Sequence, residues 1–557
     1  MPLAESMATL ADQILEDRWK TSPVTATLDG VHRYDRELDE VDADALADAA
    51  ARQRAWLARL AAIDRAALPI EARLDHAVLT GYLEAAIDAY EHVRAWQKDP
   101  SGYATTALYG VFPLALRTFA PVETRAEAAA SRLAQVRRLL EQARANLESA
   151  TSGRVSPRLF TETAIEVVRG GQAFFAEVVP RLAESLASHA LKRQLLEANA
   201  DAMAAFADYL EWLRSVHLPR STGNFAIGRE AFDLKLRAEH GLPYDAEQLD
   251  AIGREAMEQT ERSLAALART IDPNRSWMEQ VEALKRDHPT AAGLLDTYRA
   301  EMARARAFVV EHGLATLPPD ESLEVVETPV FERPLVPYAA MMPPAPFDAE
   351  QKSLFYVTPV DTTRPETEQW EQLKGHSTYA IPVTALHEAY PGHHLQISRA
   401  NRIASKVRRV VSTPVFVEGW ALYCEEMMYE AGYYPDPRVR LFQLKDLLWR
   451  ACRVVIDVGL HCMGMTPAEA VDLLVTRAHL ERANAETEVR RYCATPTQPM
   501  SYLIGRREIL ALRDAYRDRG GRPFALGAFH DAILSYGSIP VGLIREAVLA
   551  RQAGKRA

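Results

Sequence analysis

The stretch ALHEAYPGHHLQ (385–396) places three histidines and one glutamate around a proline and a glycine. The apolar run IPVTAL (381–386), which leads into it, is typical of a buried helix. Pro391 removes one backbone hydrogen bond and clashes with the preceding turn, so the helix must kink or bulge near this point. Gly392 tolerates the backbone angles that such a distortion needs. The stretch therefore predicts a helix that is interrupted between its first histidine and the later pair.

This pattern resembles a zinc-binding HExxH helix in which the spacing has been altered. In HExxH, two histidines four residues apart bind zinc from one helix face, and the glutamate activates water. Four residues after His387 stands Pro391, which cannot bind a metal. A two-residue bulge at the proline and glycine would move His393 into the place of the second ligand, with His394 as the alternative. Three structural histidines without a metal are the competing interpretation.

A third ligand is expected because a catalytic zinc usually has three protein ligands and one open position. Glu418 lies in the largely apolar segment TPVFVEGWALYCEEMMYE (413–430), far enough beyond His393 for a turn and a returning helix. A carboxylate among apolar residues is costly unless it is paired or metal-bound. We therefore predict Glu418 as the third ligand, a helix cap or ion pair being the alternative. Glu425 and Glu426 are the candidates for orienting a ligating imidazole.

The motifs around these residues resemble those of a known bacterial family. The segments TYAIPVTALHEAYPGHHLQ (378–396) and FVEGWALYCEEM (416–427) resemble domain of unknown function 885. The segment RYCATPTQPMSYLIGRREILALR (491–513) resembles that family's C-terminal motif, and SPVTATLDGVHRYDRELDE (22–40) its opening segment. The resemblance covers nearly the whole chain.

The resemblance also implies a likeness to helical gluzincin metallopeptidases of the thimet-oligopeptidase and carboxypeptidase-Taq type. In these enzymes the helix with the third ligand often reads Phe-Val-Glu, which matches residues 416–418. The altered HExxH spacing is a departure from that pattern. The substrate does not follow from the resemblance.

The remaining candidate residues follow from the chemistry of amide hydrolysis. Glu388 is the expected general base. Tyr502 is the first choice to donate a hydrogen bond to the developing oxyanion, and Tyr492 is the second choice and a candidate for substrate binding. Arg506, four residues after Tyr502, could bind a substrate carboxylate, a salt bridge being its alternative role. His461 is a candidate without an assigned role.

Bulk properties limit the class of protein. At 557 residues the chain exceeds the roughly 250–300 residues at which one hydrophobic core stops growing. Its formal net charge of −11, with acidic and basic residues interspersed, argues against nucleic acid as the main partner. The N-terminus lacks the features of a secretory signal, and no apolar run is long enough to span a membrane. Four cysteines without metal-ligand spacing suggest free thiols. We therefore expect a cytoplasmic protein without a membrane partner.

Three segments differ in texture, and together they predict a mainly α fold. Residues 1–315 read as a helical scaffold and cleft wall, and residues 367–557 as a catalytic helical region with the metal site. Between them, residues 316–366 are proline-rich and contain two strand-like runs, Leu323–Glu327 and Leu354–Thr358. We expect a large helical zincin-like body with a deep cleft and a small β-sheet near the active-site helix. The run Leu354–Thr358 is predicted to bind an extended peptide by β-augmentation.

The function predicted from the sequence is a hydrolase with one Zn²⁺ per chain that cleaves short peptides through a metal-activated water. Manganese, cobalt or iron would also suit nitrogen and oxygen ligands. Two alternatives stay open: a metallohydrolase acting on a non-peptide amide or biosynthetic intermediate, and an inactive helical binding protein. The sequence leaves the oligomeric state open.

Overall fold

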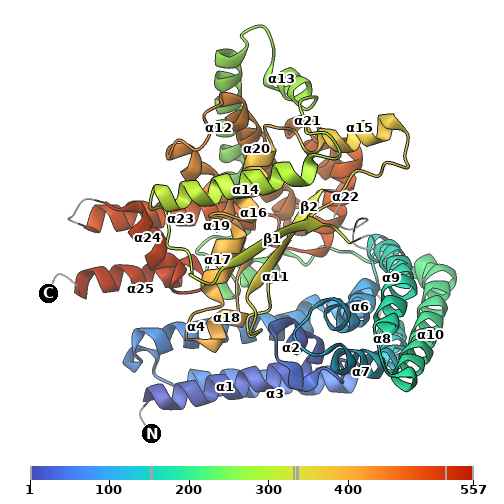
Figure 1. The fold of residues 1–557 in the computed structure, drawn as a ribbon. Coiled ribbons are helices and arrows are strands. Elements are labelled where there is room, and N and C mark those ends of the chain that lie inside the picture. Colours follow the sequence, from blue (N-terminus) through green and yellow to red (C-terminus); the bar gives the residue numbers. More distant parts are fainter. Residues whose placement is uncertain (1–2, 151–154, 330–332, 334–337, 521–523, 555–557) are drawn as a thin grey trace. The chain divides into compact units, whose positions relative to one another are not determined.

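The computed structural model describes residues 3–150, 155–329, 333, 338–520 and 524–554. It divides into two compact units, and each is described by itself. The first comprises Met1–Ala226 and Ala345–Glu350, and the second comprises Ile227–Pro344 and Gln351–Ala557. Both are built almost entirely of α-helices, with one small sheet in the second unit, which confirms the mainly α fold (Figure 1).

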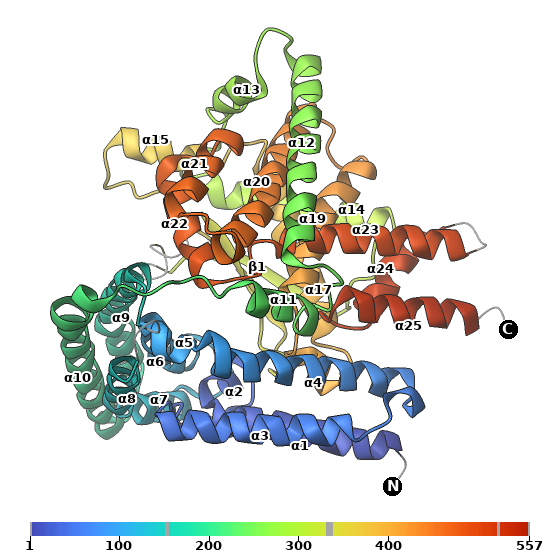
Figure 2. The same cartoon turned by 180° about the vertical axis from the view of Figure 1, so that it is seen from behind.

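The first unit is an assembly of antiparallel and crossed helices (Figure 2). Its α-helices are α1 (Leu3–Thr21), α2 (Pro23–Asp29), α3 (Ala43–Ala61), α4 (Ile70–Asp88), α5 (Ala95–Lys98), α6 (Pro100–Leu116), α7 (Val122–Leu133), α8 (Val136–Glu148), α9 (Arg158–Glu184) and α10 (His189–Trp212). Short 3₁₀ or π turns occur at η1 (His32–Tyr34), η2 (Arg65–Ala67), η3 (Ala89–Val93), η4 (Leu213–His217) and η5 (Leu218–Arg220). Helix α9 packs against α6 and α10, and α3 packs against α4.

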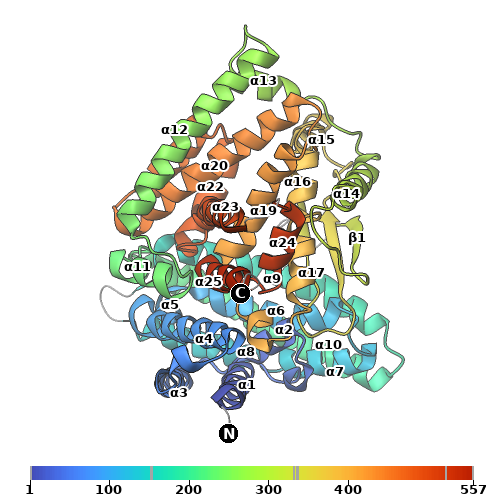
Figure 3. The ribbon, with the colours of Figure 1, turned by 90° about the vertical axis from the view of Figure 1, so that its left-hand side faces the viewer.

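The second unit holds the rest of the helices. They are α11 (Arg229–Ala238), α12 (Ala246–Ile271), α13 (Trp277–Leu284), α14 (Leu294–Glu311), α15 (Glu366–Lys374), α16 (Ile381–Glu388), α17 (His393–Ala400), α18 (Lys406–Val410), α19 (Pro414–Glu430), α20 (Pro437–Cys462), α21 (Pro467–Arg477), α22 (Arg482–Ala494), α23 (Ser501–Gly520), α24 (Leu526–Leu534) and α25 (Val541–Gly554). Two pairs have the most extensive contacts, α12 with α20 and α19 with α23 (Figure 3). The four cysteines are free, and three of them are buried.

The division between the units differs from the segments that composition suggested. It falls after Ala226, whereas the texture of the sequence changes near residue 315. Helix α12 lies before that change in texture, yet it packs along α20 and so belongs with the C-terminal helices. Composition follows local sequence, while a compact unit is defined by long-range packing.

The sheet contains three strands in the order β1-β3-β2. Strand β1 (Ser322–Glu327) runs parallel to β3 (Lys352–Val357), with Val325 opposite Phe355, and β2 (Ala339–Met342) pairs antiparallel to β3. The two strands predicted from the sequence are confirmed, and β2 was not predicted. Because β3 is paired along both edges, its backbone groups are already used, and the predicted β-augmentation on this strand is wrong.

Among the described residues, no helix is both long enough and apolar enough to cross a membrane.

Segment 345–350 belongs to the first unit although its neighbours in the chain belong to the second. The imidazole of His32 lies between two carboxylates, with Nδ1 3.0 Å from Asp35 and Nε2 3.1 Å from Asp348. Its ring also stacks on Phe119 at a centroid distance of 3.7 Å. Burial alone would lower the pKa of His32, but the hydrogen bonds and charges of the two aspartates outweigh burial and raise it to about 9. His32 therefore holds the segment as a cation.

This arrangement predicts a pH-dependent stability. Because the folded pKa of His32 lies above the unfolded value of about 6.5, its contribution is complete below pH 6.5 and disappears as the pH rises through 9. The side chain is partly exposed, so we expect an effect of only about 1 kcal/mol. Urea unfolding at pH 6 and pH 9.5 should show a larger loss of stability in the wild type than in His32→Gln. Substitution of the exposed His189 by Gln should leave the wild-type pH dependence intact, and a similar loss in the His32 variant would contradict the assignment.

Candidate metal centre

The helix that begins at Ile381 is interrupted where the sequence predicts it. Helix α16 ends at Glu388 and α17 begins at His393, with a cis Tyr390–Pro391 peptide between them. The chain folds back on itself, because the N–H of Gly392 donates to the Leu386 carbonyl at 3.0 Å. A Cβ atom on Gly392 would lie 1.8 Å from the carbonyl oxygen of His387, so this turn requires glycine.

Helix α19 supplies hydrogen-bond donors to the backbone at this break. The Pro391 carbonyl accepts a hydrogen bond from the indole N–H of Trp420 at 2.8 Å and a weaker one from the Cys424 thiol at 3.7 Å. Both side chains are fully buried. A buried carbonyl outside a regular helix needs such partners, and the helix that carries Glu418 supplies them.

The break brings four predicted residues together. The rings of His387 and His393 lie 4.9 Å apart, nearly perpendicular, and ligand atoms of His387, Glu388 and His393 all lie within 4.8 Å of one another. Oε2 of Glu418 is 3.3 Å from Nε2 of His393 and 4.0 Å from Nε2 of His387.

These spacings fit a zinc ion. Two ligands about 2.0–2.1 Å from one zinc in tetrahedral geometry are about 3.4 Å apart. Glu418 already lies at that distance from His393, and its distance of 4.0 Å from His387 would have to shorten by about 0.6 Å. Glu388 is the second carboxylate of the cluster. Both carboxylates are half-buried and lie near both imidazoles, and Glu418 is the one with a close approach, 3.3 Å, to His393.

The electrostatics of Glu418 suit that assignment. Burial alone would raise the pKa of this carboxyl, but the hydrogen bond from His393 and the nearby charges of His393, His387 and Arg453 lower it to about 2. Burial would likewise lower the pKa of His393, but Glu418, Glu388 and Glu425 raise it. A carboxylate that is charged at neutral pH is what a divalent cation binds.

One of the two adjacent glutamates on α19 orients the His387 imidazole. Nδ1 of His387 lies 2.8 Å from Oε1 of the buried Glu425, which directs Nε2 toward Glu418 and His393. Glu426 instead pairs with Arg440 at 2.8 Å. A structural ion pair explains this second glutamate.

His394 does not fit the role of alternative ligand. It is fully buried, with Nδ1 2.8 Å from Ser353 of β3 and Nε2 2.8 Å from Glu321. Glu321 also accepts hydrogen bonds from Tyr390 and, at 2.9 Å, from Arg306 of α14. Both imidazole nitrogens of His394 are thus occupied, and the contact with Ser353 shows that the small sheet lies beside the helix that begins at His393. Apart from being an acidic residue just before a predicted strand, Glu321 carried no sequence signal for this role.

Of the two candidate tyrosines, only Tyr502 lies beside the cluster. Its ring is 6.5 Å from that of His387 and nearly parallel to it, and burial together with the Glu418 charge raises its pKa. Tyr492 is fully buried, and its hydroxyl accepts hydrogen bonds from Arg453 at 2.7 Å and Trp449 at 3.2 Å. The structure therefore does not support a substrate-binding role for Tyr492, because its polar atom is already used inside the protein.

The predicted role of Arg506 also needs correction. Its guanidinium lies 3.4 Å from Glu426, which it shares with Arg440, and both partners are half-buried, so the alternative role in an ion pair accounts for this residue. His461 is buried, and its Nε2 is 3.1 Å from the carbonyl of Tyr492. Its role is structural.

Helix α20 carries a stripe of polar residues on the side that packs near the four clustered residues. Asp446, Arg450, Arg453, Asp457 and His461 recur at helical spacing on a helix that is otherwise mostly apolar. Asp457 accepts the N–H groups of Thr497 at 3.1 Å and Met500 at 3.2 Å, which holds the turn before α23. The guanidinium of Arg453 lies 4.7 Å from the Tyr502 ring. Except for His461, sequence reasoning missed this stripe, although its periodic charges on an apolar helix were a usable signal.

Helices α19 and α23 cross in backbone contact. A Cβ on Gly505 would lie 1.8 Å from the Val415 carbonyl, and a Cβ on Gly419 would lie 2.4 Å from Cα of Gly505. Gly419 follows Glu418 directly, and Gly505 lies one turn after Tyr502. The close approach of the two helices therefore sets the distance between ligand and tyrosine.

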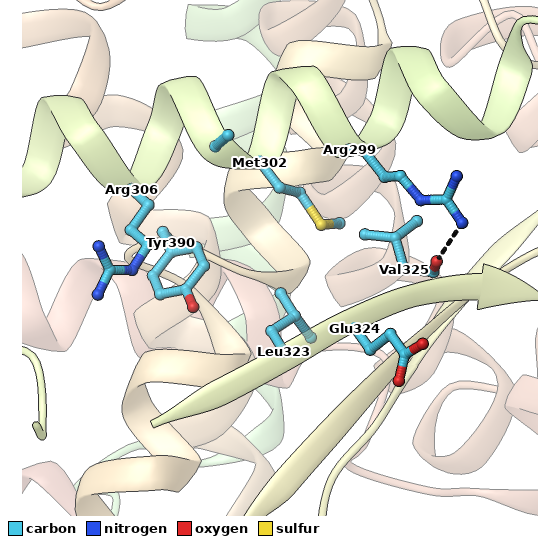
Figure 4. Close-up of a pocket in the computed structure, with 8 residues that line it drawn as sticks. Arg299, Met302, Arg306, Leu323, Glu324, Val325 and Tyr390 are labelled. Atoms are coloured by element: carbon cyan, nitrogen blue, oxygen red, sulfur yellow. Dashed lines mark hydrogen bonds between the residues drawn. The ribbon is translucent and has the colours of Figure 1, made fainter. Parts of the chain in front are cut away.

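A pocket of about 390 Å³ lies between α14 and β1 (Figure 4). Its lining residues are Arg299, Met302, Ala303, Arg306, Leu323, Glu324, Val325 and Tyr390. Arg299 donates to the Val325 carbonyl at 3.1 Å. The pocket reaches the break between α16 and α17 through Tyr390, but none of the four clustered residues lines it.

Comparison with known proteins identifies relatives but no activity. The family described as bacterial protein of unknown function, DUF885, matches residues 23–548. A solved structure described as "a putative lipoprotein of unknown function from Shewanella oneidensis" is 26% identical, with a TM-score of 0.82 over 98% of this chain and 99% of that chain. Another, "the putative lipoprotein from Colwellia psychrerythraea", is 20% identical, with a TM-score of 0.86 over 100% of both chains. No curated protein matches. The likeness to helical zinc peptidases stays a prediction.

Because α19 and α23 cross in backbone contact, adding one methyl group at the crossing should lower the stability of the fold considerably. Gly505→Ala sets Cβ against a backbone carbonyl, so we expect destabilisation of about 1–3 kcal/mol or more in urea unfolding. Gly170→Ala is the matched control, because nothing lies within 4 Å of its Cβ position on α9 and alanine favours a helix there. Equal stability of the two variants would contradict the close crossing.

The contact between His387 and Glu425 predicts an effect on metal affinity. Glu425→Gln removes the charge that orients the imidazole, and we expect zinc affinity to fall about 10- to 100-fold in a chelator competition assay. Glu430→Gln is the control, since this carboxylate lies on the same helix but pairs with Arg513 at the surface. Unchanged affinity in the Glu425 variant would argue against zinc binding by His387.

Proposed function

We propose that this chain, which belongs to the DUF885 family of bacterial proteins of unknown function, is a zinc-dependent hydrolase that cleaves amide bonds of short peptides. One observation carries the proposal: two imidazoles and a carboxylate converge at zinc-ligand spacing, with a second carboxylate beside them. The orientation of His387 by Glu425 adds support, since ligating histidines generally donate their second nitrogen to such a partner.

His387, His393 and Glu418 would hold the ion. When bound, zinc supplies Lewis-acid polarisation of a carbonyl oxygen and lowers the pKa of water toward about 7. Three protein ligands are the number that catalytic zinc sites usually have. Manganese, cobalt or iron are compatible with the same donors.

Glu388 would move the proton. It is the last residue of α16, next to a ligand in the sequence, and its half-buried side chain is reachable by water. Its carboxylate takes a proton from the attacking water and passes it to the leaving nitrogen, which departs as an amine.

Tyr502 would stabilise the oxyanion. Tyr502 is carried by α23, its ring lies 6.5 Å from that of His387, and the Arg453 guanidinium lies 4.7 Å from the same ring. Burial and the Glu418 charge raise its pKa, so it stays a proton donor at neutral pH. A hydrogen bond of this kind is worth about 2.7–4 kcal/mol in a transition state.

The location of the protein is a separate part of the proposal. Both similar solved structures are described as lipoproteins, a class that a covalent lipid holds at a membrane surface. These descriptions support a location outside the cytoplasm and at a membrane, in place of the cytoplasmic location expected from the sequence. Cell fractionation followed by detection of the native protein checks this.

The base is tested by Glu388→Gln. We expect this variant to retain about one zinc per chain by elemental analysis, while hydrolysis of a peptide library, followed by mass spectrometry, falls by about 10²- to 10⁴-fold. His387→Ala should lose the zinc itself. Unchanged turnover in Glu388→Gln would reject the base. Metal-free wild-type protein after zinc-replete expression would favour the inactive binding protein, and zinc-loaded protein that cleaves no peptide would favour a non-peptide substrate.

A further inference from the structure

We propose that Arg450 binds the C-terminal carboxylate of the peptide, so that the enzyme removes residues from the C-terminal end of its substrate. This inference rests on the proposed function and adds the direction of cleavage. It gives Arg450 the role that the sequence suggested for Arg506, which lies 3.4 Å from Glu426.

Helix α20 opens to solvent on one small face. Between Leu441 and His461 the helix is buried, except at four half-buried residues: Lys445, Asp446, Trp449 and Arg450. These positions lie one turn apart on a single helix face. We call them the α20 face.

The α20 face carries a positive charge in excess. Nζ of Lys445 donates to the Asp446 carboxylate at 3.2 Å. The guanidinium of Arg450 is 3.7 Å from the same carboxylate, and it donates a long hydrogen bond to the Asp446 main-chain carbonyl at 3.3 Å. Two cations therefore share one carboxylate, and the lysine holds the closer contact.

Arg450 is also incompletely bonded. Its Nε is buried and has no hydrogen-bond partner among the described residues. Its side chain is 12% exposed, so water compensates the guanidinium only in part, and an anion bound at its terminal nitrogens would stabilise the charge. Arg453, three residues further along the same helix, differs because Tyr492 and Glu488 occupy its guanidinium at 2.7 and 3.0 Å.

The chemistry of this site selects a carboxylate. A guanidinium offers two parallel N–H groups that match the two oxygens of a carboxylate. The ring of Trp449 lies 4.7 Å from the Arg450 guanidinium and limits the directions in which it can point. An apolar ring next to a cation also suits the end of a peptide, which presents a side chain and a charge together.

The distance between Arg450 and the candidate metal centre determines which peptide bond of a bound substrate would lie at the metal centre. Its guanidinium carbon is 6.0 Å from the Tyr502 ring, which in turn lies 6.5 Å from the His387 ring. The guanidinium and the imidazole are thus no farther apart than these two distances combined. Because an extended residue spans about 3.3–3.6 Å, a carboxylate on Arg450 would place a bond one to three residues from the C-terminus at the metal centre.

Binding is measured first, with zinc-loaded Glu388→Gln so that peptide is not consumed. The probe is a pool of N-terminally dansylated tetrapeptides without Asp or Glu, prepared once with free C-terminal carboxylates and once as C-terminal amides. We expect the acid pool to bind about 10- to 100-fold more tightly than the amide pool in fluorescence anisotropy. Adding Arg450→Ala should remove that preference without changing the affinity for amides.

Matched variants separate a specific role from a structural one. Arg450→Lys keeps the charge but loses the two-pronged geometry, so its preference should be intermediate. Arg438→Ala is the control, because this arginine lies on the same helix, is 42% exposed and pairs with Asp436. Equal binding of both pools, binding of neither pool, or an acid preference that survives Arg450→Ala would overturn the inference.

Cleavage is measured second, with the wild-type protein and the same two pools. We expect products shortened by one to three residues at the C-terminus from the acids, and little from the amides. Cleavage of both pools at the same rate would leave the hydrolase standing and overturn the role of Arg450. Absence of cleavage together with acid-selective binding that depends on Arg450 would leave the anion site standing and remove the hydrolase.

Discussion

The carbonyl of Pro391 is buried but lies outside any regular helix, so it needs hydrogen-bond donors from elsewhere in the chain. The residues that supply them determine how the centre of the second unit is packed. Trp420 and Cys424 supply the partners, and both lie on α19. An unsatisfied buried carbonyl would cost about 1–3 kcal/mol, so the break is stable only with α19 against it. The same helix carries Glu418, so the contact that stabilises the break also places the third candidate ligand beside the two histidines.

The other side of the break is held by the small sheet. Glu321, just before β1, is hydrogen-bonded to Tyr390, His394 and Arg306. The second nitrogen of His394 is hydrogen-bonded to Ser353 of β3. The neighbouring histidines therefore have opposite roles. His394 anchors the chain to the sheet, and His393 is turned toward Glu418.

Support from behind comes from α20 and α23. Asp457 holds the turn that leads into α23, and the contact of Gly505 with α19 fixes how near Tyr502 can come to the cluster. Arg453 donates hydrogen bonds to Tyr492 and Glu488, whereas the buried Nε of Arg450 has no partner among the described residues, although both arginines lie on one stripe. This difference is what separates a supporting residue from a candidate ligand-binding residue.

Several features could be predicted from the sequence alone because they depend on interactions between residues that are close in the chain. The helical class follows from apolar periodicity, and the interruption near Pro391 follows from the steric limits of proline and glycine. Donor chemistry and spacing were enough to select His387, His393, Glu388 and Glu418, which the structure brings together. Two of the three strands were visible as short apolar runs.

Only the tertiary structure decided which partner each side chain meets. Glu425 and Glu426 are adjacent and chemically identical, and packing alone assigns one to His387 and the other to Arg440. The same holds for the burial of Tyr492, the pairing of Arg506, the central position of β3 and the placement of α12 with the C-terminal helices. These outcomes depend on contacts between residues far apart in the chain, and neither periodicity nor composition carries information about such contacts.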